Sequence, residues 1–214
     1  MSIPIKDNAS FGKVDFKNMD CKAYTMFYGA MKTFRERTEM SLPYKTLTIR
    51  TGVHLRGDSP YSTTNVVRIP PTYPLSYMDM ETANHELAHT VRQTLDGSFI
   101  HLLYDVARFN YLRKHKCNST TNEGFAFNEG WSEFWAGSCK GPWDRKPVGQ
   151  QVVSSLDSKE MQVEGNVANA IRRLQKVCDS SYHMLVALLR SYRGKIHSFE
   201  EFNNYHYQRY HCKL

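Results

Sequence analysis

The spacing of hydrophobic residues changes twice in the first half of the chain. Over residues 20–40 apolar side chains recur at every third or fourth position, which predicts a helix with one buried face. Hydrophobic and polar residues then alternate over 46–55 and again over 63–69, which predicts two strands, the second ended by a pair of prolines. The helical spacing returns over about 79–96, so we expect the order helix, strand, strand, helix.

The second half of the chain is predicted to be almost entirely helical, because its apolar residues keep the helical spacing. The expected helices cover about 98–112, 125–138, 160–178, 182–192 and 198–210. The chain has no internal repeat, and 214 residues suit a single domain over residues 1–214. The predicted fold class is α+β, with a small mixed α/β N-terminal half and a mainly helical C-terminal half.

The helix predicted over about 79–96 carries the motif His85-Glu86-x-x-His89. Residues four apart lie one turn apart on the same helix face, so both imidazoles can bind one zinc ion. Glu86 lies one residue round the helix, where it can take a proton from an attacking water as a general base. Burying these three groups without a partner would be costly, and a metal ion removes that cost. The alternative is a hydrogen-bonded pair of core histidines.

A second motif narrows the class of metal site. The metzincin pattern would need glycine and histidine where this chain has Arg92 and Leu95. Further along, Asn-Glu-Gly at 128–130 is followed by an aromatic and a small residue, which resembles the second metal-binding helix of the gluzincins, the clan of thermolysin and the zinc aminopeptidases. The resemblance implies that Glu129 is the third zinc ligand. It also implies that Glu133 accepts a hydrogen bond from the first ligand histidine and orients it.

Three glutamates have alternative interpretations. Glu123 belongs to an identical Asn-Glu-Gly pattern six residues upstream of Glu129. Because a loop-like run precedes it, its preferred role is that of a first-turn acid that interacts favourably with the helix dipole. For Glu133 the alternative to orienting the ligand histidine is a position on a solvated helix face. Glu164 lies in an element that resembles one following the ligand helix in some gluzincins. It is either an additional active-site acid or a solvated first-turn acid.

The resemblance also carries expectations about the substrate cleft. A zincin-like fold would place one strand at the sheet edge, where its backbone pairs with an extended substrate. Residues 63–69 are the candidate for that strand, and the alternative is an interior strand with only protein partners. A second donor for the oxyanion is expected after the ligand helix, and no spacing selects among the five candidates. These are Tyr182, His183, Tyr205, His206 and His211.

Composition and charge modify this picture only slightly. With 41% hydrophobic residues the chain can bury a sizeable core, and it has no apolar run long enough to span a bilayer and no secretion signal at its start. We therefore expect no membrane association and a cytoplasmic location. The terminal Cys-Lys-Leu resembles a peroxisomal address and gives a weaker alternative.

The net charge of +7 does not predict nucleic-acid binding, because the basic residues are dispersed and no nucleic-acid motif is present. The five cysteines are also dispersed, without metal-ligand spacing, and are expected to be reduced thiols. Taken together, the motifs predict a zinc-dependent metallopeptidase that acts on a peptide or protein substrate with one Zn²⁺ per chain. The alternative is a catalytically inactive zincin-like domain that binds a metal or a protein partner.

Overall fold

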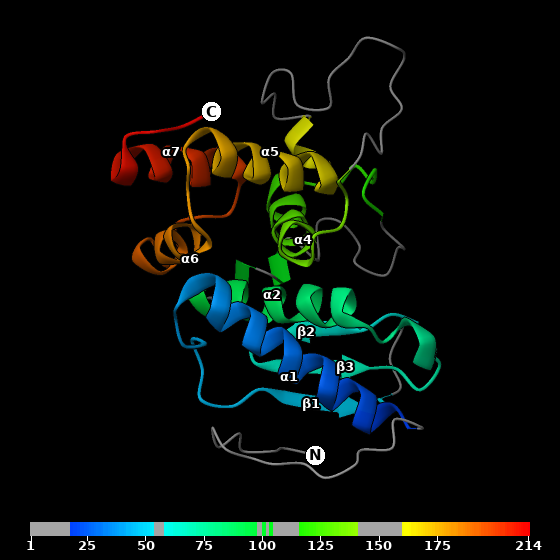
Figure 1. The fold of residues 1–214 in the computed structure, drawn as a ribbon. Helices are drawn as coiled ribbons and strands as arrows, with labels where there is room; N and C mark the ends of the chain where they lie inside the picture. Colours follow the sequence, from blue (N-terminus) through cyan, green and yellow to red (C-terminus); the bar gives the residue numbers. More distant parts are fainter. Residues whose placement is uncertain (1–17, 54–57, 98–99, 102, 105–115, 141–159) are drawn as a thin grey trace.

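The computed structural model describes residues 18–53, 58–97, 100–101, 103–104, 116–140 and 160–214 (Figure 1). Within these ranges the protein is a mixed α and β structure that is mostly helical, which confirms the predicted α+β class. In chain order the elements are α1 (Met19–Thr38), β1 (Thr48–Thr51), β2 (Tyr61–Thr63), β3 (Val66–Ile69), η1 (Leu75–Tyr77), α2 (Met80–Asp96), α4 (Glu123–Ala136), η2 (Glu160–Gln162), α5 (Glu164–Val177), α6 (Tyr182–Ser191) and α7 (Phe199–Tyr210).

The three strands form one sheet in the order β1-β3-β2. Strand β3 runs parallel to β1 and antiparallel to β2, with Val67 opposite both Ile49 and Ser62. The predicted edge strand over 63–69 is therefore interior where it forms β3, because both of its sides are paired with protein strands. The edge strand beside α2 is β2, a three-residue element that is too short to give a recognisable alternation in the sequence.

Helix α2 lies between the sheet and the helical half of the molecule (Figure 1). It begins where the Asp79 side chain accepts a hydrogen bond from the Thr82 backbone N–H, and it ends at Gly97, which has a left-handed φ of 74°. Packing against β2, β3 and α1 on one side and α4 on the other buries most of the helix. Polar residues on α2 are therefore held in fixed positions inside the protein.

Helices α4 and α5 approach closely at Gly130 of α4. A Cβ atom added there would lie 2.6 Å from the backbone oxygen of Glu164 and 2.6 Å from the Cβ of Val167. The site therefore accepts no side chain unless one helix moves. Glu164 itself is completely buried at the start of α5, so its interpretation as a solvated acid is wrong.

Replacing Gly130 by alanine is expected to lower the free energy of unfolding by about 1–3 kcal/mol, as overpacked cores generally do. The matched control is Gly29→Ala in α1, whose added Cβ would meet the flexible end of Met80 at 2.9 Å. That side chain can move, and alanine favours the helix, so the control should be close to neutral. Urea unfolding of both variants measures the difference. Equal stabilities would show that α4 and α5 separate without cost.

Four of the five cysteines are paired, so the prediction of reduced thiols is wrong for these four. Disulfides join Cys117 to Cys139 and Cys178 to Cys212, and Cys21 is free. No local spacing indicates these pairs, because partners 22 and 34 residues apart meet only after the helices between them have packed. The first disulfide links the chain just before α4 to the chain just after it.

Two sequence expectations concern parts that the structure describes incompletely. Of the helix predicted over 98–112, residues 100, 101, 103 and 104 are helical, and the others lie outside the described residues. Among the helices that are described, none is long and apolar enough to cross a membrane.

Candidate metal centre

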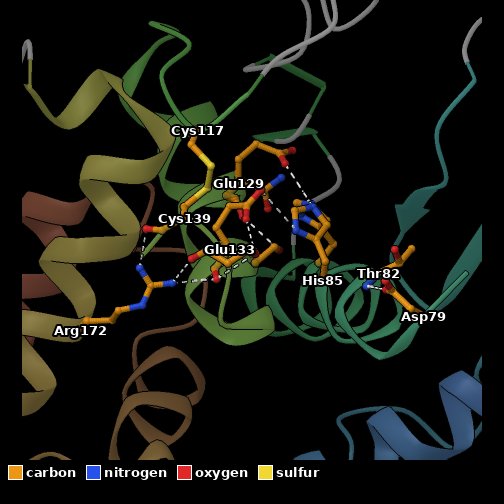
Figure 2. A network of polar contacts seen from close by, with 12 residues as sticks. Asp79, Thr82, His85, Cys117, Glu129, Glu133, Cys139 and Arg172 are labelled. Carbon is orange, nitrogen blue, oxygen red and sulfur yellow. Dashed lines mark hydrogen bonds and ion pairs between the residues drawn. A yellow bond between two sulfur atoms is a disulfide. The ribbon is translucent and has the colours of Figure 1, made fainter. Parts of the chain in front are cut away.

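Three side chains from two helices converge between α2 and α4 (Figure 2). The Nε2 atoms of His85 and His89 are 3.1 Å apart. One carboxylate oxygen of Glu129, Oε2, lies 3.5 Å from Nε2 of His85 and 3.3 Å from Nε2 of His89. The residues that the sequence predicts as zinc ligands thus place three donor atoms at the corners of a nearly equilateral triangle.

The size of this triangle fits a zinc ion. A tetrahedral zinc with ligand bonds of ~2.0–2.1 Å separates its ligand atoms by about 3.3 Å. The separations of 3.1, 3.3 and 3.5 Å lie around that value. Three donors of the His₂Glu type leave one of the four tetrahedral positions for water or substrate, as catalytic zinc sites do.

The alternative ligand, Glu123, is not part of this cluster. It is the first residue of α4 and lines a different cavity, together with His101 and His197. Glu129 is 1% exposed and faces both histidines, so the arrangement favours Glu129 for the third position.

Negative charge surrounds His85. Burial lowers the pKa of its imidazole, but the hydrogen bond to Glu129 and the charges of Glu133 and Glu86 outweigh burial and raise the pKa to about 10. The cluster therefore stabilises a positive charge between the two helices. A metal ion would compete with a proton for the same position, since a histidine must be neutral to bind metal.

Glu86 is held from the side of the sheet. Its carboxylate oxygen Oε2 accepts a hydrogen bond of 2.6 Å from the Ser62 hydroxyl, which also lies 3.0 Å from the Glu86 backbone oxygen. Glu86 is 5% exposed and Ser62 4%. The Gln93 side chain donates to the backbone oxygen of Ser62 at 3.2 Å and accepts from the backbone N–H of Thr64 at 2.7 Å. These two bonds fix β2 against α2. The backbone oxygen of Ser62 in β2 and the backbone N–H of Thr64, just after β2, are therefore occupied by protein and not free to pair with a substrate.

Ser62→Ala is expected to lower kcat about tenfold with little change in KM or metal content. A hydrogen bond to a charged group contributes about 1.5–3 kcal/mol, and tenfold in rate corresponds to about 1.4 kcal/mol. The matched control is Ser132→Ala, which removes a buried hydroxyl that donates to Asn128 at 3.3 Å and touches neither Glu86 nor the three ligands. Steady-state kinetics on both variants makes the comparison. Equal activities of the two variants would show that the Ser62 hydrogen bond does not contribute to turnover.

Glu133, one turn after Glu129 on α4, faces the other ring nitrogen of His85. Its Oε1 is 3.7 Å from Nδ1 of His85, an ion-pair separation longer than the predicted hydrogen bond. The other carboxylate oxygen contacts the Ser138 hydroxyl. Arg172 of α5 donates to the backbone oxygens of Glu133 at 3.0 Å and Cys139 at 2.8 Å (Figure 2). The end of α4 is thus held by an arginine and a disulfide next to the residue facing His85.

Four of the five predicted oxyanion donors have other contacts, and the ring of Tyr182 stacks on Phe134 with the centroids 5.4 Å apart. His206 is buried and contacts the Ser180 hydroxyl at 2.8 Å and the Cys212 oxygen at 2.6 Å. Nδ1 of His183 binds the Thr38 oxygen at 2.7 Å. The ring of Tyr205 stacks on Tyr192 with the centroids 4.2 Å apart. The fold gives these four side chains structural contacts, with His183 reaching the end of α1 and the other three lying within the helical half.

Two features of the described residues were not predicted. Ser62 comes just before the second predicted strand and had no predicted role, and its contact with Glu86 follows only from the position of β2 beside α2. The cluster of Asp96, His101 and His197 is brought together from three separate segments. This cluster could not be predicted because His197 is distant in sequence from the other two residues.

Comparison of the chain with protein-family models, with curated proteins and with solved structures finds no match in any of the three. The class of the protein is therefore judged from its own residues: an α+β domain with a His₂Glu donor triangle and a buried glutamate beside it.

Proposed function

We propose that this protein is a zinc-dependent metallopeptidase of the gluzincin type. The observation that carries the proposal is the donor triangle of His85, His89 and Glu129, whose edges match tetrahedral zinc, with the carboxylate of Glu86 on the same helix. The resemblance of the two motifs to the gluzincins supports the same class. The mixed α+β fold, with the edge strand β2 beside the motif helix, is compatible with that class.

The proposed roles follow from the contacts. A bound zinc ion supplies Lewis acidity, which makes water more acidic and withdraws electron density from a carbonyl oxygen. Glu86 acts as the general base: its carboxylate takes a proton from the attacking water and passes it to the leaving nitrogen. Ser62 holds one oxygen of Glu86, which leaves the other for the proton. Glu133 keeps Nδ1 of His85 facing a carboxylate, so that Nε2 is the ligand atom.

The test is digestion of a broad peptide library by the purified protein, with its zinc content measured in parallel. We expect cleavage that phenanthroline abolishes and that added zinc restores. A zinc-loaded protein that cleaves nothing would overturn the peptidase and leave the inactive metal-binding domain. The absence of bound zinc, even after reconstitution, would overturn both.

The disulfides affect where such an activity would operate. Structural disulfides persist in oxidising compartments and are rare in the cytosol. We infer that an oxidising compartment suits this fold better than the cytoplasm expected from the sequence. Mass spectrometry of alkylated protein from its native source would test this. Full labelling of Cys117 and Cys139 without a reductant would contradict it.

A further inference from the structure

A second cluster of metal-ligating side chains lies at the far end of α2 from its N-terminus. Asp96 is the last residue of α2, His101 follows it, and His197 comes from the connection between α6 and α7. Nδ1 of His101 is 3.5 Å from Oδ2 of Asp96, and Nδ1 of His197 is 3.9 Å from Oδ1. The two imidazole rings meet edge to face with their centroids 4.1 Å apart. One donor atom from each residue lies within 4.8 Å of the other two.

The hydrogen bonding of His197 leaves a lone pair directed at this cluster. Its Nε2 lies 3.1 Å from the backbone oxygen of Gly194, which can only accept, so Nε2 carries the proton. In the neutral ring Nδ1 then has no proton and faces the Asp96 carboxylate. Two groups with lone pairs face one another, at a distance too long for a hydrogen bond. Metal-binding histidines commonly donate their second nitrogen to a backbone carbonyl in this way.

Asp96 supplies a buried atom without a partner. Its side chain is 7% exposed, and neither Oδ1 nor Nδ1 of His101 has a hydrogen-bond partner within the described part of the chain. Buried polar atoms in native proteins are normally paired, so an unpartnered carboxylate oxygen beside two histidines is a position where a cation would supply the missing partner. The donor set, two imidazoles and one carboxylate, is a common one for zinc.

Arg92, one turn earlier on α2, faces the other carboxylate oxygen of Asp96. Its Nη1 is 3.7 Å from Oδ2 of Asp96, while Nη2 donates to the Ile196 oxygen at 2.5 Å. The arginine thereby anchors the chain next to His197. Glu201 adds a negative charge beside the cluster, since its Oε2 accepts a hydrogen bond of 2.6 Å from the His197 backbone N–H.

The cluster opens into a cavity of about 520 Å³ lined by both histidines, Glu123 and Glu201 among others. A metal ion held by three protein donors would therefore have a position open to water.

We propose that Asp96, His101 and His197 form a second metal-binding site, for a divalent transition-metal ion such as zinc, separate from the His85, His89 and Glu129 centre. The ion would link the end of α2 to the start of α7. The proposal does not depend on peptidase activity, because it rests on donors that are not part of that site.

The test is zinc titration of metal-free protein, together with anomalous diffraction at the zinc edge from crystals grown with zinc. We expect two equivalents per chain and an anomalous peak between Asp96, His101 and His197. The double variant His101→Ala with His197→Ala should bind one equivalent, and so should His85→Ala with His89→Ala. His211→Asn, which removes an exposed histidine and tolerates the left-handed φ of 55° there, should still bind two.

The outcomes can be distinguished because the position of each anomalous peak shows which of the two sites holds the metal ion. A single peak, at the His85 centre only, would overturn the second site and leave the proposed function standing. A peak at the second cluster alone would support the second site and overturn the proposed function. Two equivalents retained by the His101→Ala, His197→Ala variant would also overturn the proposal. The anomalous peak in the wild-type protein decides the question even if a variant fails to fold.

Discussion

Glu86→Gln is expected to keep its metal and to lose turnover by a factor of about 10²–10⁴, the usual range for removal of a general base. Glutamine has the shape of glutamate and can still accept the Ser62 hydrogen bond, so the buried site should keep its geometry. It cannot take a proton at neutral pH. The loss should therefore appear in kcat, with the zinc content unchanged, when cleavage of the best library peptide is measured.

The matched control for this substitution is Glu81→Gln, one turn and one residue earlier on the same helix. Glu81 lies exposed in the first turn of α2, so its removal changes the helix charge without touching the site. Its activity should stay close to that of the wild type. A Glu86→Gln protein as active as this control would rule out Glu86 as the base.

Glu129→Ala is expected to weaken zinc binding by more than about 100-fold. Loss of a hydrogen-bonding partner behind a ligand already costs 10–100-fold, and Glu129 would be a ligand itself. The substitution also leaves His85 and His89 without the carboxylate 3.5 and 3.3 Å away. Competition with a chromophoric chelator measures the affinity, and cleavage should fall in parallel at limiting zinc.

The control for Glu129 is Glu123→Ala on the same helix. Glu123 has the same sequence context but faces the other cavity, so its removal should leave affinity at the first centre unchanged. If Glu123→Ala lost zinc affinity and Glu129→Ala did not, Glu123 would be the third ligand and Glu129 would not. Equal losses in both variants would indicate that α4 itself has been disturbed.

The helices and the pairing of His85 with His89 could be predicted because local rules determine them. Four-residue spacing puts His85 and His89 on one face whatever surrounds the helix. Glu129 was predicted from the resemblance of its motif to the gluzincins, and the apolar residues after that motif form a buried helix face in the structure, with Trp131 and Trp135 stacked. These features depend on residues close together in sequence.

The features that could not be predicted depend on how distant segments meet. Strand β2 has only three residues, and only its pairing with β3 shows that it is the edge. The contact of Ser62 with Glu86 spans 24 residues and needs β2 to lie along α2. Both disulfides close over packed helices for the same reason. No local pattern in the sequence encodes such distances.

Both disulfides lie after residue 116, so the half of the described chain that carries α1, the sheet and α2 has no covalent cross-link of its own. A metal ion at the first centre would join this half, through His85 and His89, to the cross-linked half, through Glu129. In polymer terms it would close a third loop, one that spans both halves and that reduction cannot open. Chelation and reduction would then loosen different parts of the chain: the first would release the sheet half from α4, and the second would free the ends of the helices behind it.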